Sequence, residues 1–227
     1  MHDIDIPQEI VDLAIQRRGR LRLFEDVDPA RTAHLIIDMQ VGFTTPGAPA
    51  EIPNAVGIIE NINAISAACR EAGVLNVFVQ NTIDDESKST WSNWFEAFWT
   101  PEKRAGMYAT FADGSPGHAL HPSIETEDND LRINKYRFGA FIKDTSDAHA
   151  LLTSRGIDTL IITGCATNIC CESTARDAMM LNYRVFFVCD ATATHTDAEH
   201  NGTLATMLLT FADVIDVEDM TAMLARG

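Results

Sequence analysis

The chain has 227 residues, and its 17 Lys and Arg stand against 33 Asp and Glu, which gives a formal net charge of −16. This balance argues against nucleic acid and anionic membrane surfaces as partners, because both are bound through clustered Lys and Arg. The content of 46% hydrophobic and 22% charged residues argues against disordered and fibrous classes, and no run approaches the roughly 18 apolar residues of a membrane span.

The cysteines and the N-terminus indicate the compartment. The five cysteines are an odd number and lack the paired CxxC spacing of a zinc ribbon. A disulfide framework is typical of a small secreted chain with an even number, so we expect reduced thiols, with Cys69 and Cys189 in the core. Residues 1–5 carry neither the basic region nor the apolar stretch of a signal peptide. These features predict a cytoplasmic protein.

Residues 1–30 are predicted to form an N-terminal helical extension. Within it, residues 7–17 have the apolar spacing of a short amphipathic helix. The segment 17–22 follows and holds four of the 17 positive charges. Two interpretations stay open for this basic cluster: a solvated arm, or a segment that docks on an acidic face of a neighbouring subunit.

Beyond the extension, short apolar runs alternate with segments of helical period. The predicted strands are residues 35–37, 74–79, 131–133, 159–163, 185–189 and 214–217, and the predicted helices are 55–72, 147–154, 168–181 and 197–211. Continuously apolar strands between helices are typical of a parallel sheet that is covered on both faces. We therefore predict one α/β domain over residues 31–227, with any ligand at the carboxyl ends of the strands.

An aromatic-rich insertion at about residues 84–130 interrupts this alternation. It contains all three tryptophans of the chain, Trp91, Trp94 and Trp99. A long aromatic insertion is typical of a lid over a site. A separate hydrophobic cluster beneath a loop is the alternative, and the sequence leaves both open.

Three side chains with reactive groups fall at predicted strand ends or in the turn after one: Asp38, Lys135 and Cys170. A thiol at a helix start faces the positive end of the helix dipole and free backbone N–H groups, which favour the thiolate and can hold an oxyanion. An Asp can accept the thiol proton, and a Lys can hold that acid charged. Each residue also has an ordinary structural role open to it, as a buried Cys, a capping Asp or a solvated Lys.

Three motifs occur in a characteristic order: residues 35–40 (LIIDMQ), 134–141 (NKYRFGAF) and 163–170 (TGCATNIC). Together they resemble the isochorismatase-like cysteine hydrolase superfamily over roughly residues 31–220. The resemblance implies a single three-layer α/β domain with a six-stranded parallel sheet flanked by helices. It also implies a homo-oligomer, either a dimer or a tetramer.

The same resemblance implies roles for particular residues. It implies a catalytic triad of Asp38, Lys135 and Cys170. It also implies an oxyanion hole formed by the backbone amides of Ala166 and Cys170, and a non-proline cis peptide bond between Cys165 and Ala166. The nucleophile is expected at Cys170 and not at Cys171, because it follows the Thr of the turn by three residues.

Two departures narrow the branch of the family. Nicotinamidase-type members hold a metal through an Asp and several histidines between the first two motifs, but no His occurs from residue 35 to 117, so we expect no metal and no other cofactor. Isochorismatases proper cleave a vinyl ether without a nucleophilic Cys, so Cys170 points to an amide or ureide bond. The run 170–177 (CCESTARD) looks most like the ureidoacrylate, biuret and triuret hydrolases. Gly139 stands where that branch often has Ser.

The predicted activity is therefore a cysteine-dependent amidohydrolase that cleaves a C–N bond of a small ureide, carbamoyl or carboxamide substrate through a thioester and releases ammonia or carbamate. An isochorismatase-type vinyl-ether hydrolase and a catalytically silent interaction module are the alternatives. The candidate substrate-binding residues are Gln40, Gln80, Asn81, Trp91, Trp94, Arg137 and Phe138. Arg137 is a candidate clamp for a substrate carboxylate, with a structural ion pair as its alternative. His195 and His200 are expected to be packing or solvated residues rather than metal ligands.

Overall fold

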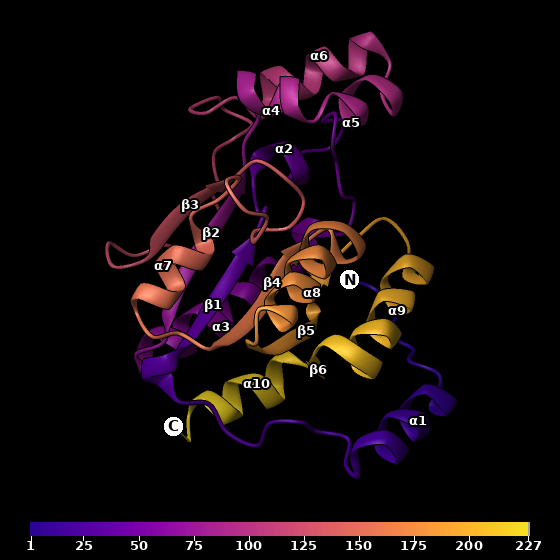
Figure 1. The fold of residues 1–227 in the computed structure, drawn as a ribbon, viewed down its shortest axis with the longest axis vertical. Coiled ribbons are helices and arrows are strands. Elements are labelled where there is room, and N and C mark those ends of the chain that lie inside the picture. The colour runs from indigo at the N-terminus through magenta and orange to yellow at the C-terminus, as the bar shows by residue number, and fades with distance from the viewer. Residues whose placement is uncertain (227) are drawn as a thin grey trace.

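The computed structural model describes residues 1–226, whose centre is a six-stranded sheet with the strand order β3-β2-β1-β4-β5-β6 (Figure 1). Every neighbouring pair of strands is parallel. The strands are β1 (Thr32–Ile37), β2 (Leu75–Asn81), β3 (Leu131–Lys135), β4 (Thr159–Cys165), β5 (Arg184–Ala193) and β6 (Asp213–Ile215). The predicted single α/β domain with a six-stranded parallel sheet is confirmed.

Helices connect the strands and cover the sheet. The α-helices are α1 (Gln8–Arg18), α2 (Val41–Thr44), α3 (Ile59–Ala72), α4 (Asp85–Thr90), α5 (Ser92–Ala97), α6 (Pro101–Thr110), α7 (Ala148–Ser154), α8 (Glu172–Met180), α9 (Asp197–Thr206) and α10 (Val217–Leu224). Two short 3-10 turns are η1 (Pro29–Arg31) and η2 (Ala55–Ile58), and two π-helical turns are η3 (Thr167–Cys171) and η4 (Met207–Phe211).

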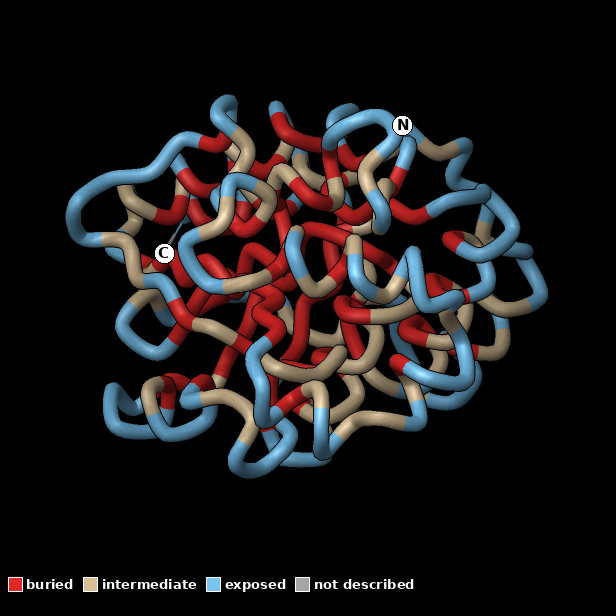
Figure 2. The backbone as a smooth tube through the Cα atoms, turned by 90° about the horizontal axis from the view of Figure 1, so that it is seen from above, coloured by how far each residue is buried: buried red, intermediate tan, exposed pale blue. Residues whose placement is uncertain are grey.

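The sheet separates two hydrophobic cores. Along β1, Ile36 points into the core shared with α3 and α10, whereas Leu35 and Ile37 point into the core shared with α7, α8 and η4. Alternate residues of a strand face opposite sides, so a strand buried on both faces must be apolar throughout. Figure 2 shows the result: buried backbone fills the centre and exposed loops surround it.

The predicted insertion contains three short helices, α4, α5 and α6, which stand beyond the sheet next to α2 in Figure 1. The first turns of α4 and α6 are fixed by side-chain caps: Asp84 accepts from the backbone N–H of Ser87, and Thr100 accepts from that of Lys103. The buried residues Phe95, Met107 and Phe111, with Ile83, form a third hydrophobic cluster here. This cluster is separate from the two sheet cores.

Three elements differ from the sequence expectations. Helix α10 has no counterpart among the predicted helices, since residues 214–217 were expected to be strand and β6 ends at Ile215. The helix expected over 168–181 begins as the π-helical turn η3. The helix expected over 197–211 ends in the π-helical turn η4.

The N-terminal segment folds against the rest of the chain. Helix α1 packs on η4 and ends at Gly19, which has the positive φ typical of a helix C-cap. Within the basic cluster, the Arg22 guanidinium donates to the Val214 carbonyl and to Asp219, so this part of the cluster is an intramolecular contact. Among residues 1–226, no helix combines the length and apolar character needed to cross a bilayer.

Candidate active site

The carboxyl ends of four adjacent strands form the site. Ile37 at the end of β1 is in register with Gly164 of β4 on one side and with Val79 of β2 on the other. Asn81 at the end of β2 is in register with Lys135 of β3. Asp38, Lys135 and the turn after β4 therefore share one edge of the sheet, as expected for parallel strands.

Asp38 and Lys135 form a fully buried ion pair. Lys135 Nζ lies 2.8 Å from Oδ2 of Asp38, and neither side chain is exposed to solvent. Because β2 lies between their strands, the long Lys side chain must cross about two strand spacings of 4.8 Å. Lys135 Nζ also donates to the Arg137 carbonyl at 3.1 Å. Neither carboxylate oxygen of Asp38 receives a hydrogen bond of good geometry from residues 1–226, so the carboxylate can accept a further proton donor.

The thiol of Cys170 contacts both members of this pair. Its Sγ is close enough to the Asp38 carboxylate and the Lys135 ammonium for both charges to shift its pKa, and the residue is only 5% exposed. Burial raises the pKa of Cys170 to about 12, and the charge of Asp38 adds to this effect while Lys135 opposes it. The free site therefore holds a thiol at neutral pH. This corrects the expectation that the helix start favours the thiolate, because desolvation outweighs the dipole.

The pKa values of Asp38 and Lys135 are shifted in directions that favour proton transfer from Cys170 to Asp38. Burial raises the pKa of Asp38 against the opposing attraction of Lys135, so Asp38 is a stronger base than an ordinary carboxylate. Burial by itself would lower the pKa of Lys135, but attraction to Asp38 and Cys170 raises it above its ordinary value. Lys135 therefore stays charged, and Asp38 is poised to take a proton.

The turn between β4 and α8 has an unusual backbone. The peptide bond between Cys165 and Ala166 is cis, and Gly164 before it has φ of +112°. A Cβ at Gly164 would overlap the backbone of Ile37, so only Gly allows β4 to approach β1 this closely. The π-helical turn η3 follows and carries Cys170. Such turns are frequent at functional sites.

A cavity of about 220 Å³ opens over Cys170. Ala166 and Ile169 of the turn lie beside the thiol at its wall. The insertion contributes Trp91, Trp94, Phe95, Trp99 and Met107 to the wall. The aromatic side chains that line the cavity are Phe43, Trp91, Trp94, Phe95, Trp99, Tyr136 and Phe138. Of the candidate substrate-binding residues, the structure brings Asn81, Trp91, Trp94 and Phe138 to this cavity.

Gln40 and Gln80 do not line the cavity, contrary to expectation. Their side-chain amides both donate to the carbonyl of His118, and the Gln40 side chain also bridges both backbone groups of Asn81. A fully buried amide must satisfy its hydrogen bonds within the protein, so these two glutamines hold the 118 loop against the sheet edge.

Arg137 also lies outside the cavity. Its guanidinium donates to the Tyr136 carbonyl and to the Thr90 hydroxyl, and its central carbon lies 5.2 Å from the centre of the Trp91 ring. It lines a separate polar depression together with Asp84. In this structure Arg137 holds the insertion against β3, and the expected carboxylate clamp is not formed.

Residues that the sequence interpretation missed include Tyr136 and Glu51. Both line the cavity. Glu51 follows a Pro- and Ala-rich loop that carries no periodic signal, so nothing in the sequence places it near Cys170. His195, interpreted as a packing or solvated residue, is exposed and lines the rim. Among residues 1–226, no group of three or more His, Cys, Asp or Glu side chains is arranged to hold a metal ion.

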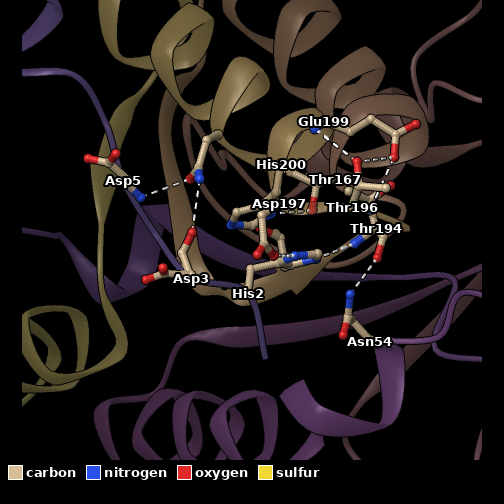
Figure 3. Close-up of polar contacts among 12 residues, drawn as sticks. His2, Asp3, Asp5, Asn54, Thr167, Thr194, Thr196, Asp197, Glu199 and His200 are labelled. Carbon is tan, nitrogen blue, oxygen red and sulfur yellow. Dashed lines mark hydrogen bonds and ion pairs between the residues drawn. The ribbon is translucent and has the colours of Figure 1, made fainter.

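The N-terminal residues support the nucleophile turn from behind (Figure 3). The His2 ring accepts from the backbone N–H of Thr194, contacts Asp197 at 2.7 Å, and stacks on His200 with ring centres 4.3 Å apart. His200 Nδ1 in turn lies 2.9 Å from the hydroxyl of Thr167 in η3. Two stacked rings thus connect the start of the chain to the turn that carries Cys170.

Comparison with known proteins identifies the family. The family model described as "Isochorismatase domain" matches residues 32–219, most of the chain. This chain belongs to the isochorismatase family. Ureidoacrylate amidohydrolase RutB from Caulobacter vibrioides is 34% identical to this isochorismatase-family chain over 178 residues, which cover 73% of the chain and 78% of that relative. The predicted superfamily and the predicted class of amide-bond hydrolase are confirmed by these matches.

Solved structures of isochorismatase-family proteins share the fold. A cysteine hydrolase from Pseudomonas syringae pv. phaseolicola 1448A superposes with a TM-score of 0.77 at 21% identity, covering 91% of this chain and 98% of the other. An isochorismatase family protein from Desulfovibrio vulgaris superposes with a TM-score of 0.72 at 28% identity, covering 86% and 99%. The α/β architecture is therefore that of the isochorismatase family.

Proposed function

We propose that this protein is a cysteine amidohydrolase that cleaves a C–N bond of a small ureide, carbamoyl or carboxamide substrate through a thioester. The observation that carries the proposal is the Cys170 thiol, which lies at the wall of a cavity and contacts the buried Asp38–Lys135 pair. The relationship to ureidoacrylate amidohydrolase RutB supports an amide-type bond as the target.

The first half of the reaction forms the covalent intermediate. Asp38 takes the proton of Cys170 as its sulfur attacks the carbonyl carbon, because a thiol with a pKa near 12 must lose its proton during attack. The backbone amides of Ala166 and Cys170 are assigned to the oxyanion, and one such donor is worth about 10²–10³ in rate in other enzymes. When the C–N bond breaks, Asp38 gives the proton to the departing ammonia or amine.

The second half releases the acyl group. Asp38, again unprotonated, takes a proton from a water molecule that attacks the thioester, and the C–S bond breaks. The sulfur recovers a proton from Asp38, and the product leaves as a carboxylic or carbamic acid. Lys135 keeps a positive charge next to the carboxylate and the sulfur throughout, which stabilises whichever of them is negative.

The test is release of ammonia or amine from a panel of ureides, carbamates and small carboxamides by the wild-type protein and by Cys170→Ala. We expect at least one substrate to be hydrolysed, with activity lowered by at least about 10³-fold in the variant. Cys189→Ala is a matched control, because Cys189 is a half-buried thiol of β5 that does not line the cavity. Full turnover by Cys170→Ala would overturn the proposal, as would release of ammonia or amine from no member of the panel.

A further inference from the structure

The residues that line the Cys170 cavity indicate what kind of substituent the substrate bears next to the bond that is cleaved. We propose, on the basis of the function proposed above, that the substrate is an uncharged ureide or carboxamide with an apolar, ring-sized substituent, and not a carboxylate. Six aromatic side chains that form the wall carry this inference: Phe43, Trp91, Trp94, Trp99, Tyr136 and Phe138.

Four of these rings pack directly against one another: Trp91, Trp94, Trp99 and Phe138. Trp91 and Trp94 are stacked with ring centres 5.7 Å apart, and Phe138 meets both of them edge-on at 4.7 and 5.0 Å. Such packing holds the rings in place before a ligand arrives. An apolar substituent that displaces water from this surface gains roughly 25 cal/mol for each Å² that it buries, and a ring gains further from edge-on contacts.

The lining has almost no charge. Glu51 is its single formally charged side chain within residues 1–226, and its carboxylate already accepts the backbone N–H of Gly47 at 2.7 Å. No Lys or Arg among those residues lines the cavity, since Lys135 lies behind the thiol and pairs with Asp38. A substrate carboxylate would lose its water without gaining a cation and would meet the charge of Glu51.

The polar groups that the cavity does offer are neutral. Asn81 and Tyr136 are among the lining residues, and within residues 1–226 neither side chain makes a hydrogen bond. The indole N–H of Trp99, a residue of the same wall, is buried and has no hydrogen-bond partner among residues 1–226. A ureide or carboxamide has the carbonyl and N–H groups to satisfy such donors and acceptors without a net charge.

The guanidinium of Arg137 lies over the Trp91 ring of this wall, and its contacts argue against a role as a carboxylate clamp. Its two terminal nitrogens donate to Tyr136 O and Thr90 Oγ1, both at 2.7 Å. Reaching a substrate would break both bonds and the contact with the Trp91 ring. Two ligands that differ only by a carboxylate distinguish a cavity that binds neutral substrates from one that binds carboxylates.

The experiment measures binding to Cys170→Ala through tryptophan fluorescence, which reports on this cavity because all three tryptophans of the chain line it. The probes are benzylurea and 4-(ureidomethyl)benzoate, which share a ring and a ureide and differ by one carboxylate. We expect benzylurea to bind at least tenfold more tightly at pH 7.5. Equal or tighter binding of the benzoate overturns the proposal, and so does the absence of binding by both.

Two variants localise the effect. Trp94→Ala is expected to weaken benzylurea binding about tenfold, whereas Phe98→Ala, an adjacent ring that is 71% exposed and does not line the cavity, is expected to leave it unchanged. Arg137→Gln is expected to leave the preference between the two probes unchanged. Weaker binding of the benzoate to Arg137→Gln, with benzylurea binding unchanged, would show that Arg137 binds the carboxylate and would overturn the proposal.

Turnover of the same two probes separates this inference from the proposed function. If the wild-type protein prefers the benzoate and Cys170→Ala abolishes the reaction, the substrate class is wrong and the proposed function stands. If hydrolysis of either probe persists in Cys170→Ala, the proposed function is wrong, and the binding comparison still decides the ligand class.

Discussion

The Nζ of Lys135 lies 2.8 Å from Oδ2 of Asp38 at a depth where neither side chain meets solvent. Two opposite charges there cancel at long range, so the pair costs less to bury than either ion alone. The thiol of Cys170 contacts both partners, and its protonation therefore depends on each of them in opposite directions. This opposition gives the site a signature that can be measured without a substrate.

The first prediction concerns thiol alkylation by iodoacetamide. The charge of Asp38 raises the pKa of Cys170 and the charge of Lys135 lowers it. At pH 8.5 we therefore expect Asp38→Asn to speed alkylation of Cys170 and Lys135→Met to slow it. Both variants are expected to lose amide hydrolysis by about 10²-fold or more, because each lacks one half of the proton-transfer pair.

The alkylation rate is read by peptide mass spectrometry, with Cys189 as an internal reference in the same samples. Circular dichroism establishes that each variant is folded, since an unpaired buried charge is destabilising. Rates that change in the same direction in both variants would contradict the proposed contacts.

The second prediction concerns the close approach of β4 and β1. Gly164→Ala is expected to lower the free energy of unfolding by more than about 2 kcal/mol, because its Cβ would overlap the Ile37 backbone and because its φ is +112°. Gly202→Ala in α9 is the control: nothing lies within 4 Å of its Cβ position, and Ala favours a helix by up to about 1 kcal/mol. The midpoint of urea unfolding should fall in Gly164→Ala and rise in Gly202→Ala. A midpoint that changes in the same direction in both variants would contradict this role of Gly164.

The third prediction concerns acid stability and His34. Burial lowers the pKa of His34 to about 4, while its ring hydrogen-bonds Asn76 and Thr163 with Arg70 and Asp130 nearby. In the unfolded chain the His34 imidazole takes up a proton near pH 6.5. The contribution of neutral His34 to the free energy of unfolding is therefore fully present above that pH and is lost as the pH drops toward 4. The loss due to His34 is about 3 kcal/mol over that interval.

Urea unfolding at pH 7.5 and pH 4.5 measures this slope. His34→Gln is expected to reduce the stability difference between the two pH values, whereas His195→Gln, a change at an exposed residue, is expected to leave it unchanged. An undiminished slope in His34→Gln would show that other groups cause the acid sensitivity.

The fourth prediction concerns the N-terminal support of the nucleophile turn. His2→Ala removes the contacts with Thr194 and Asp197 and the stacked partner of His200. We expect kcat to fall roughly tenfold with little change in KM, because a small displacement of reacting groups slows chemistry more than binding. Hydrogen exchange should rise in residues 166–171.

Gln8→Ala is a control near the same terminus, since the Gln8 amide donates only to Asp12 on its own helix. A His2→Ala variant with unchanged kcat and unchanged exchange in the turn would show that the stacked rings serve the N-terminus alone.

The elements of the fold that could be predicted are those whose hydrophobic pattern is strong within the element itself. Each of the six strands contains a short, largely apolar stretch and is recognisable from it, whereas α10 has no counterpart because its first residue, Val217, ends a strand-like run that begins at Val214. The π-helical geometry of η3 has no sequence period of its own. The turn contacts β1 and α9, through the approach of Gly164 to Ile37 and the contact of Thr167 with His200, which no local pattern encodes.

The candidate site was predictable where the chemistry lies at strand ends. Asp38, Lys135 and Cys170 converge because parallel strands end at one edge. The substrate-binding residues were predicted less well, since Gln40, Gln80 and Arg137 also follow strands but direct their side chains to backbone carbonyls and a hydroxyl. Which polar group faces a cavity depends on tertiary packing by the insertion, and no local pattern encodes that packing.

The central claim is that Cys170 becomes covalently acylated during hydrolysis. Rapid acid quenching of the wild-type protein with an excess of a hydrolysed amide, followed by peptide mass spectrometry, tests it most directly. The account predicts an acyl adduct on the peptide that carries Cys170, formed within the first turnover and absent from Cys170→Ala. Steady turnover with no adduct on that peptide, together with activity retained in Cys170→Ala, would contradict it.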